Sequence, residues 1–400
     1  MHIPIKKSTF TRTDILTRGV EEIIEKKSLA KRLSSGGKLR VKFGIDPTGP
    51  DIHLGHTVAL WKLRQFQDAG HKAVLIIGDF TATIGDPSEQ SKERKMLTKK
   101  EVKNNMKTYL QQIAKILDMK KTEIRHNSEW HEKEGLNAAL QLARTATLLQ
   151  LTKRSDFKER IKKGEDITFI ELFYPLLQAY DSVKIKADVE IGGTDQKFNL
   201  LMGRQIQRKY GQKPQDILTF PLLLGTDGVR KMGKSFDNYI ALSDKSHNMF
   251  GKIMSIPDSE IVKYFELVTP IPLGEINKIK KEKISGTTAR NLKLNLAETI
   301  TSLYWGKDAA QKAGERFKKV FQEKDVTRAI EEKSIPKSTK NTGPVLTEVL
   351  KVSKSEARRL VNQGGVYIDG KRVGDYNQDI PRKPFTLRVG KKRIMKIILK

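Results

Sequence analysis

The 400-residue chain has no cysteine, which excludes disulfide bonds, thiolate zinc sites and a cysteine nucleophile. It also lacks any stretch approaching the roughly 18 uninterrupted apolar residues that a membrane helix needs, and its first ten residues contain no apolar signal core. Hydrophobic residues still make up 37% of the chain, enough to bury a sizeable core, so a disordered or collagen-like protein is excluded. We therefore expect a cytoplasmic protein of two or three domains that has no membrane partner.

Acidic residues are scarce relative to basic ones, with 47 Asp and Glu against 76 Lys and Arg and a net charge of +29. Such an excess favours a polyanionic partner through counterion release, although a generally lysine-rich proteome would also produce it. Residues 1–235 carry +15, residues 236–343 carry +5 and residues 344–400 carry +9, the highest charge per residue. A uniform bias would raise all three segments alike, so we expect a nucleic-acid contact that includes the C-terminal end.

The first half of the chain alternates short apolar runs with amphipathic stretches, which predicts an α/β fold in which helices cover both faces of a Rossmann-like parallel sheet. A helix over residues 56–69 should follow the first strand, and a second should start at Thr98, which forms a capping box with Glu101, and continue to Ile116. The expected strands are residues 40–46, 73–80, 187–191 and 217–224.

After Ile240 the pattern is helical and lysine-rich, without strand-like runs until about residue 329. A compact module follows, in which a helix should start with a capping box between Ser353 and Glu356 and end near Gly364, before two hairpins. We therefore expect four parts: an α/β domain (1–235), an α-helical domain (236–330), a polar linker (331–343) and a small basic α+β domain (344–400).

The last of these parts presents Arg358 and Arg359 on a helix and Lys371 and Arg372 on a hairpin. A short basic helix beside a basic hairpin is a plausible RNA-binding surface. A solvated cap on any domain would use the same residues. We favour RNA because the charge density is highest here.

The segment from Asp46 to His56 (DPTGPDIHLGH) lies at the first strand-to-helix junction, on the edge where open parallel sheets bind ligands. His53 and His56 are three residues apart at the helix start, where free backbone N–H groups attract phosphate, and Gly55 lets a flat ring approach the backbone. Imidazoles there would stabilise charge developing on a phosphoryl oxygen. The alternative is two surface histidines with a helix-capping role.

The segment from Gly228 to Ser235 (GVRKMGKS) has the letters of a phosphate-binding loop. Its context differs, because a turn precedes it and the following residues have little helical periodicity. We interpret it instead as a mobile loop that brings Lys231, Lys234 and Ser235 onto a polyphosphate. An ordinary basic turn is the alternative.

Three polar residues, Tyr174, Gln178 and Asp181, share one face of an apolar helical segment, which indicates a small polar ligand better than a solvated helix face. Asp195 and Gln196 follow a glycine pair at a strand end, and Asp86 follows the second strand. Since the carboxyl ends of parallel strands meet at one edge, these groups should converge.

With HLGH early, KMGKS late, and GDPS, YPLLQAYD and GGTDQ between them, the chain resembles the bacterial tyrosyl-tRNA synthetases over nearly its whole length. HLGH and KMGKS resemble the two signatures of class I aminoacyl-tRNA synthetases. The closing basic module resembles the ribosomal-protein-type RNA-binding domain that ends many members.

The resemblance implies that tyrosine and ATP form tyrosyl-adenylate and pyrophosphate, after which the tyrosyl group passes to the terminal adenosine of a tRNA. It further implies a homodimer built through residues 125–180, an anticodon-binding role for the α-helical domain, and ATP with magnesium as a substrate, without a protein-bound metal site. The site residues it implies are His53 and His56 for the reacting phosphate; Lys231, Lys234 and Ser235 for pyrophosphate; Asp46, Thr48, Gly55, Gly193 and Asp195 for ATP; and Asp86, Tyr174, Gln178, Asp181 and Gln196 for tyrosine, with Asp181 accepting the phenolic hydroxyl.

Two departures stand out. Many members have tyrosine where Lys42 stands, as a second contact to the phenolic oxygen, and Gly-Lys where Glu89 and Gln90 follow Ser88. Lys92 or Arg94 is a candidate for the missing phosphate-facing charge. The rival hypotheses are a tryptophan-specific sister enzyme, a non-catalytic RNA-binding protein on the same scaffold, and a phosphate-loop NTPase.

Overall fold

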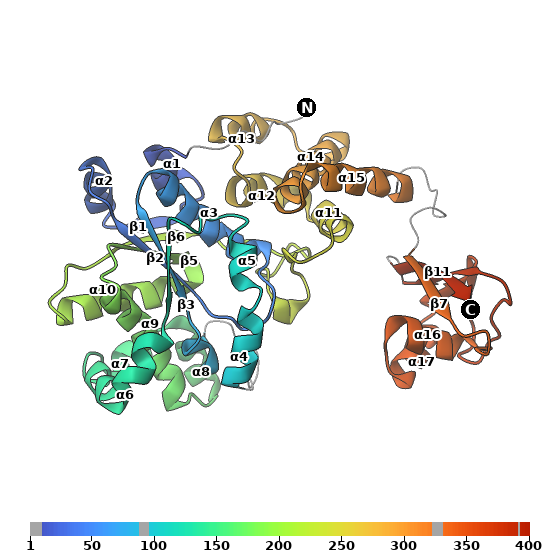
Figure 1. Ribbon diagram of the computed structural model, residues 1–400, viewed down its shortest axis with the longest axis horizontal. Coiled ribbons are helices and arrows are strands. Elements are labelled where there is room, and N and C mark those ends of the chain that lie inside the picture. Colours follow the sequence, from blue (N-terminus) through green and yellow to red (C-terminus); the bar gives the residue numbers. More distant parts are fainter. Residues whose placement is uncertain (1–9, 88–95, 322–330, 391–392) are drawn as a thin grey trace. The chain divides into compact units, whose positions relative to one another are not determined.

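The computed structural model describes residues 10–87, 96–321, 331–390 and 393–400, which form two compact units, Met1–Gly314 and Glu315–Lys400 (Figure 1). No helix in the described ranges is long and apolar enough to span a bilayer. The expected assignment of four functional parts stays a prediction, because the structure separates compact units and not activities.

The first unit contains a six-stranded sheet in the order β1-β6-β5-β2-β3-β4. Every neighbouring pair is parallel except β1 and β6, so the predicted α/β class and parallel sheet are confirmed. The strands are β1 (Glu22–Ile24), β2 (Arg40–Ile45), β3 (Lys72–Ile77), β4 (Thr122–His126), β5 (Val189–Gly193) and β6 (Asp216–Phe220).

The two edge strands, β1 and β4, were not predicted from the sequence. β1 is three residues long and only half-buried throughout, and β4 (TEIRH) alternates charged residues with Thr122 and Ile124. Both have weak apolar patterns because an edge strand buries little of its surface, so the periodicity that marks the central strands is missing.

Helices cover the sheet on both sides, with α3 and α5 on one side and α9 and α10 on the other (Figure 1). The predicted apolar stripe of α3 is buried, including Val58, Leu60 and Phe66. The helices of this part are α1 (Arg12–Thr17), α2 (Lys26–Ser34), α3 (Leu54–Asp68), α4 (Lys99–Met106), α5 (Tyr109–Ile113), α6 (Ser128–Ala143), α7 (Leu148–Leu151), α8 (Ser155–Lys163), α9 (Phe169–Lys184) and α10 (Lys197–Lys209), with 3₁₀ turns η1 (Thr81–Thr83), η2 (Thr194–Gln196) and η3 (Lys234–Phe236).

The strand order places a switch point between β2 and β5. The chain runs outward from β2 through β3 to β4 and then returns through α6–α9 to add β5 on the other side of β2. Connections that leave neighbouring strands in opposite directions open a crevice at their carboxyl ends, which is where doubly wound sheets bind ligands.

The helix expected from Thr98 to Ile116 is broken into α4 and α5. Its capping box is present, since the Glu101 amide donates to Thr98 Oγ1 (3.2 Å) and Thr98 donates its own amide to Glu101 Oε2 (2.8 Å). The break after Met106 lets Asn105 donate to the Pro47 carbonyl and Thr108 to the Pro50 carbonyl. These bonds tie the broken helix to the loop that precedes α3.

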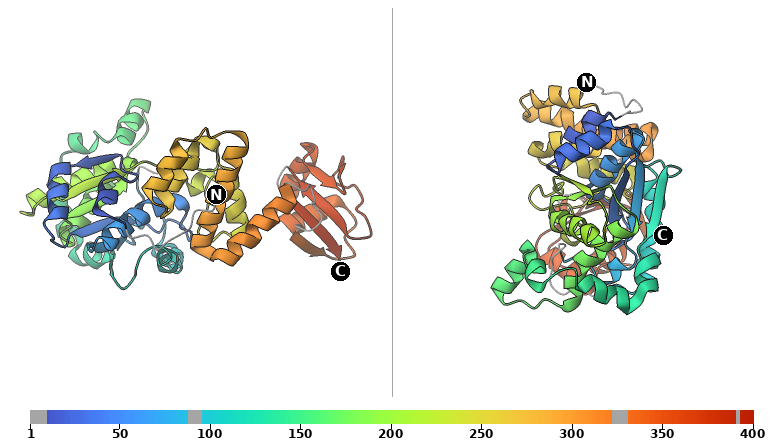
Figure 2. Two further views of the ribbon diagram at one scale, coloured as in Figure 1. Left: turned by 90° about the horizontal axis from the view of Figure 1, so that it is seen from above. Right: turned by 90° about the vertical axis from the view of Figure 1, so that its left-hand side faces the viewer.

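A helical group follows the α/β part within the same unit, and both views of Figure 2 show it at one end of that part. Arg18, which lies after α1, joins the two, since its buried guanidinium donates to the carbonyls of Phe265, Glu266, Thr269 and Ile271. The absence of strands between residues 240 and 321 is as predicted. The helices are α11 (Ser246–Met254), η4 (Asp258–Glu260), α12 (Ile261–Val268), α13 (Leu273–Lys280), α14 (Gly286–Trp305) and α15 (Lys307–Phe321), the last of which continues past Gly314 into the second unit.

The second unit is an α+β fold, as predicted, with a five-stranded sheet in the order β7-β11-β10-β8-β9. The hairpin turn at Asp369 and Gly370, both at positive φ, is also as predicted. Its elements are β7 (Glu331–Ile335), α16 (Thr342–Leu350), α17 (Lys354–Asn362), β8 (Val366–Ile368), β9 (Lys371–Arg372), β10 (Phe385–Val389) and β11 (Arg393–Leu399).

Two expectations for this unit need correction. The expected linker (331–343) starts with β7, which pairs in parallel with β11 and buries Ile335 in the core; one buried apolar residue in a polar run gives no sequence signal. The capping box of α17 is only half formed. Ser353 accepts the Glu356 amide at 3.2 Å, but the Glu356 carboxylate turns to Arg359 instead.

Candidate active site

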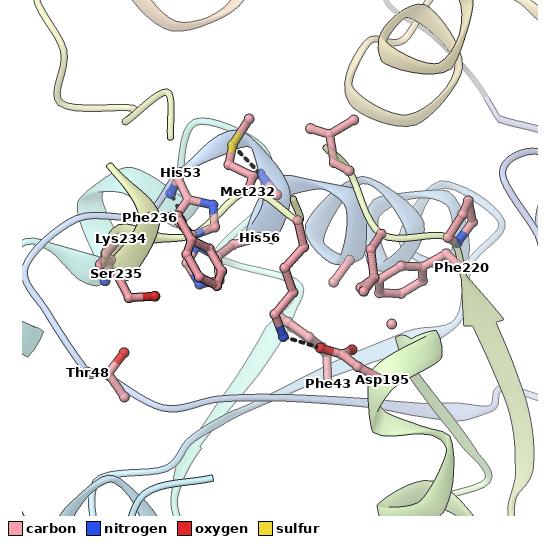
Figure 3. Close-up of a pocket in the computed structure, with 18 residues that line it drawn as sticks. Phe43, Thr48, His53, His56, Asp195, Phe220, Met232, Lys234, Ser235 and Phe236 are labelled. Carbon is pink, nitrogen blue, oxygen red and sulfur yellow. Dashed lines mark hydrogen bonds and ion pairs between the residues drawn. The ribbon is translucent and has the colours of Figure 1, made fainter. Parts of the chain in front are cut away.

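A cavity of about 310 Å³ lies at the carboxyl ends of β2, β5 and β6, at the switch point of the sheet (Figure 3). Phe43 on β2 and Phe220 at the end of β6 contribute apolar walls. The remaining lining comes mainly from the two signature segments, which are separated by about 180 residues in the sequence. Nine of the predicted site residues line it: Thr48, His53, Gly55, His56, Gly193, Asp195, Lys231, Lys234 and Ser235.

The two histidines of the HLGH segment lie side by side at the start of α3, with ring centroids 3.8 Å apart. The His53 amide donates to His56 Nδ1 (3.2 Å), so a neutral His56 carries its proton on Nε2. Burial and the Lys234 ammonium lower the pKa of His56 to about 3. Burial first, and then His56 and the two loop lysines, lower the pKa of His53 well below its usual value. Both rings are therefore neutral at pH 7 and can act as uncharged hydrogen-bond donors.

Gly55 gives the His53 ring its space. A Cβ at this position would lie 3.0 Å from two atoms of that ring, closer than an ordinary contact. The sequence indicated that Gly55 admits a flat ring; in the structure, the ring is an imidazole of the protein itself.

The KMGKS loop lies against the same cavity. Lys231 Nζ is 2.8 Å from Asp195 Oδ2, and Met232 Sδ accepts the Gly55 amide at 3.3 Å, so the loop contacts both η2, which follows β5, and α3 (Figure 3). Lys234 extends past Gly49 to within 6.0 Å of the centre of the Tyr109 ring. The loop ends in the single turn η3, and the next helix, α11, begins only at Ser246. It therefore lacks the long helix that follows a phosphate-binding loop of the NTPase type.

Asp46 and the residues predicted to bind tyrosine do not line this cavity and are instead held in polar networks. Tyr174 and Asp181 both lie on α9, together with Gln178, as the spacing predicts. Tyr174 Oη donates to Asp46 Oδ2 (3.0 Å), and Thr81 Oγ1 donates to Asp46 Oδ1 (2.8 Å). Asn127 donates to Thr81 Oγ1 (2.9 Å) and reaches Asp181 Oδ2 (3.4 Å), which completes a connection from Asp46 to Asp181.

Asp181 is 3% exposed. Its Oδ1 accepts from Trp130 Nε1 (2.9 Å) and pairs with His131 Nε2 (3.0 Å). Sequence reasoning named Asp181 but missed all its partners, which come from the start of α6, about 50 residues earlier. No local pattern in the sequence connects the two segments.

A closed ring of hydrogen bonds holds Asp86 and Gln196. Gln196 Nε2 donates to Asp86 Oδ2 (2.7 Å), and Gln196 Oε1 accepts from Asn199 (3.0 Å). Arg154 closes the ring by donating to Asn199 Oδ1 (3.0 Å) and to Asp86 Oδ1 (2.8 Å). Asn199 also donates to Gln178 Oε1 (2.9 Å). Arg154 and Asn199 were not predicted from the sequence, in which the three-residue spacing of Gln196 and Asn199 is the only signal for either.

Lys42 lies outside the polar network that reaches Asp181. Its fully buried ammonium donates to the Gln178 carbonyl and to Ser182 Oγ, each at 2.8 Å, and pairs with Glu190 at 2.8 Å. Lys42 is thus used to hold α9 against β5. The other departure from the family pattern, at Ser88, Glu89, Gln90, Lys92 and Arg94, lies outside the described residues.

The predicted RNA-binding residues of the second unit lie on α17 and β9. Arg358 lies over the Tyr376 ring at 5.0 Å, and Arg359 pairs with Glu356 at 2.6 Å. Both arginines line a surface hollow of about 520 Å³ along α17. The Arg372 guanidinium lies against Gly364 just after the helix, so β9 and α17 contribute to one basic region, with Lys371 exposed beside it.

Histidine, aspartate and glutamate side chains do not gather in threes around a possible metal position anywhere in the part of the chain that the structure describes.

Each of the two units matches a known protein family. Residues 34–322 match the family described as class I tRNA synthetases (W and Y), and residues 345–382 match the S4 domain. The chain is 50% identical over 386 residues to the tyrosine–tRNA ligase of Thermotoga maritima, a match that covers 96% of each chain. It is 46% identical over 398 residues to that of Carboxydothermus hydrogenoformans, covering 96% of this chain and 97% of the other.

Solved structures agree on the fold. A truncated mitochondrial tyrosyl-tRNA synthetase from Aspergillus nidulans superposes with a TM-score of 0.65 at 22% identity, covering 79% of this chain and 95% of that one. The tyrosyl-tRNA synthetase of Archaeoglobus fulgidus, solved with L-tyrosine, gives 0.62 at 23% identity, covering 75% and 98%.

Proposed function

The chain belongs to the tyrosine–tRNA ligases, and from that premise we propose that the cavity between β2, β5 and the KMGKS loop is where it binds ATP and forms tyrosyl-adenylate. It is an enzyme of the class I synthetases, and the relatives support tyrosine over tryptophan as its amino acid. The observation that carries the proposal is the meeting of HLGH and KMGKS at the switch point of the sheet.

Adenylate formation is an in-line attack of the tyrosine carboxylate on the α-phosphate of ATP, which requires positioning and charge stabilisation and no protein nucleophile. In this proposal His53 and His56 donate to the reacting phosphate as neutral imidazoles, since their lowered pKa values keep both uncharged. The proton on His56 Nε2 is the one available for that bond. Magnesium enters with ATP as part of the substrate.

Lys234 and Ser235 would then bind the departing pyrophosphate, while Asp195 would bind the ribose and Thr48, Gly55 and Gly193 would lie along the nucleotide. The ion pair between Lys231 and Asp195 is compatible with this assignment. A ribose hydroxyl that reaches Asp195 would free the Lys231 ammonium to turn towards the phosphates. ATP binding and loop rearrangement would therefore occur together.

Tyrosine would lie deeper, next to α9. Asp86, Tyr174 and Gln196 would bind its ammonium group, with Gln178 in support and Arg154 and Asn199 holding the set in place. Asp181 would accept the phenolic hydroxyl. Its burial supports discrimination against phenylalanine, because a buried acceptor that is left without its partner costs free energy.

A homodimer is supported by the surface of the segment over residues 125–180. Seven of the twelve large exposed apolar side chains among the described residues come from it, the most exposed being Phe169 at 82%. Monomeric proteins rarely gather that much apolar surface in one region. The occupant proposed for it is a second copy of the chain.

Transfer RNA is the second substrate, and we propose that the helical part of the first unit binds its anticodon region. In the S4 domain, Arg358, Arg359, Lys371 and Arg372 would contact phosphates. The cytoplasmic location inferred from the sequence stays a prediction.

Exchange of labelled pyrophosphate into ATP, measured with tyrosine, tryptophan and phenylalanine in turn, tests the proposal directly. Exchange should depend on tyrosine. Exchange supported by tryptophan alone would overturn the amino-acid assignment, and ATP hydrolysis without any amino acid would indicate an NTPase. No exchange from an intact, tRNA-binding protein would favour a non-catalytic RNA-binding role.

A further inference from the structure

His131 is buried in the first turn of α6 and contacts the carboxylate that is proposed to select tyrosine. Its Nε2 is 3.0 Å from Asp181 Oδ1, and its side chain is 3% exposed. The ring stacks on Phe80, with centroids 5.1 Å apart and planes inclined by 29°. Tyr180 approaches it from α9 at 6.0 Å. Packing on two sides thus fixes the direction in which Nε2 points.

The hydrogen-bond direction follows from the partners. An ionised carboxylate only accepts hydrogen bonds, and Asp181 Oδ1 already accepts from Trp130 Nε1, which can only donate. With Asp181 as a carboxylate, His131 is the donor in this contact and carries its proton on Nε2.

The two oxygens of Asp181 are consequently unequal. Oδ1 accepts two well-formed bonds, whereas Oδ2 accepts the longer one from Asn127, at 3.4 Å. Donors on one oxygen fix the rotation of the carboxylate and favour its charged form in a buried setting. The other oxygen retains the capacity to accept a further donor.

We propose that His131 is a specificity-determining positioning residue, which holds Asp181 so that Oδ2 faces the phenolic hydroxyl of tyrosine. This inference rests on the proposed role of Asp181. It also bears on Lys42, which stands where many family members have a tyrosine that contacts the phenolic oxygen. Lys42 is bound to Glu190 and cannot supply that second polar contact. His131 supplies an additional donor to the same site by acting on the carboxylate.

The consequence concerns discrimination rather than general activity. Without the His131 donor, the Asp181 carboxylate would rotate more freely, and Oδ2 would be held less firmly towards a phenol. Phenylalanine makes no bond to Asp181, so its binding does not depend on His131. A residue that acted only through packing would affect both amino acids alike.

Variants of His131 separate a role as a hydrogen-bond donor from a role in packing alone. His131→Phe keeps a ring to stack on Phe80 but removes the donor, whereas His131→Gln carries an amide nitrogen that can reach Asp181. His131→Asn has the same chemistry as His131→Gln but is one methylene too short, which makes the Asn and Gln pair a comparison of reach alone. Asp181→Asn serves as the reference for a damaged phenol site.

Pyrophosphate exchange on the full-length protein gives kcat and KM for tyrosine and phenylalanine. In His131→Phe and His131→Asn we expect the KM for tyrosine to rise roughly tenfold, as for loss of one hydrogen bond to a charged group, with kcat and the KM for phenylalanine little changed. His131→Gln should restore most of the discrimination. Equal losses for tyrosine and phenylalanine, or Asn and Gln variants that behave alike, would overturn the inference. The Asn and Gln pair keeps it testable even if His131→Phe fails to fold.

The reference variant separates this inference from the proposed function. If Asp181→Asn leaves the tyrosine-to-phenylalanine ratio unchanged, the proposed role of Asp181 fails, and the inference fails with it. If Asp181→Asn abolishes discrimination while His131→Asn preserves it, only the role of His131 is refuted.

Discussion

The neutral histidines at the start of α3 should make the first unit sensitive to acid, and His56→Asn should remove a defined part of that sensitivity. Burial lowers the pKa of His56 in the folded protein to about 3, against 6.5 for an unperturbed histidine. Below pH 6.5 the unfolded chain therefore binds a proton at this position that the folded chain does not. The contribution of His56 to stability is fully present above pH 6.5 and is lost as the pH falls towards 3.

The size of the effect follows from the difference between the two pKa values. The pKa of an unperturbed histidine lies about 1.5 units above pH 5. Proton binding at that pH therefore stabilises the unfolded state by about 2 kcal/mol at this one residue. Asparagine is a suitable replacement because its Oδ1 can accept the His53 amide, as His56 Nδ1 does at 3.2 Å, and it does not titrate. The difference in unfolding free energy between pH 7.5 and pH 5 should thus be about 2 kcal/mol smaller in His56→Asn than in the parent.

Urea denaturation followed by tryptophan fluorescence measures this on the intact chain. All three tryptophans, Trp61, Trp130 and Trp305, lie in the first unit, so the signal reports that unit alone.

The control for this measurement is His126→Asn. Its bond to Asp79 raises the pKa of His126, so its stabilisation is present below pH 6.5 and is lost as the pH rises through the raised value. Its removal should steepen the loss of stability in acid. Identical pH dependence in His56→Asn and the parent would refute the idea that His56 is buried in its neutral form.

Three further predictions concern the parts of the proposed enzyme. Lys234→Ala should slow pyrophosphate exchange roughly 100-fold and leave tyrosine affinity unchanged, whereas Lys245→Ala, at an exposed position, should leave both exchange and affinity unchanged. A matching loss of tyrosine binding in Lys234→Ala would contradict the assignment of Lys234 to pyrophosphate. Ending the chain after residue 321 removes the second sheet as a whole, because β7 pairs with β11. This truncation should raise the tRNA concentration needed for aminoacylation at moderate salt but leave pyrophosphate exchange unchanged. Loss of exchange would instead make the second unit part of the catalytic fold. Phe169→Glu should shift the sedimentation of the protein from dimer to monomer, and an unchanged dimer would locate the interface elsewhere.

The sequence predicted the central features of the fold because their signals are local. The apolar spacing of α3 and the alternation of apolar runs with helices are properties of short windows, and the parallel sheet follows from them. Convergence of HLGH, KMGKS and the residues after β5 could also be anticipated, since carboxyl ends of parallel strands share an edge. The spacing of Tyr174, Gln178 and Asp181 likewise fixed their common helix.

What could not be predicted depends on partners distant in the sequence. Arg154 reaches Asp86 across 68 residues, and His131 reaches Asp181 across 50. The helix break before α5 results from side chains bonding to the loop at Pro47 and Pro50, which no helical periodicity encodes. Similarly, β7 is a strand only because β11 pairs with it. In each case the deciding interaction forms only when the chain has folded.

The buried pair of Lys42 and Glu190 restricts how this chain can diverge. Replacing Lys42 with tyrosine alone, the residue many relatives carry, would leave the Glu190 carboxylate charged in the interior, at a cost of about 3–5 kcal/mol. Gln215 and Ser182 donate to the same carboxylate and would not neutralise it. Replacing Glu190 alone would likewise leave the buried Lys42 ammonium without its carboxylate, so a viable mutational path between the two forms must change both positions together. The two positions are epistatic, and grafting the tyrosine as a single substitution would yield an unstable protein for a reason unrelated to catalysis.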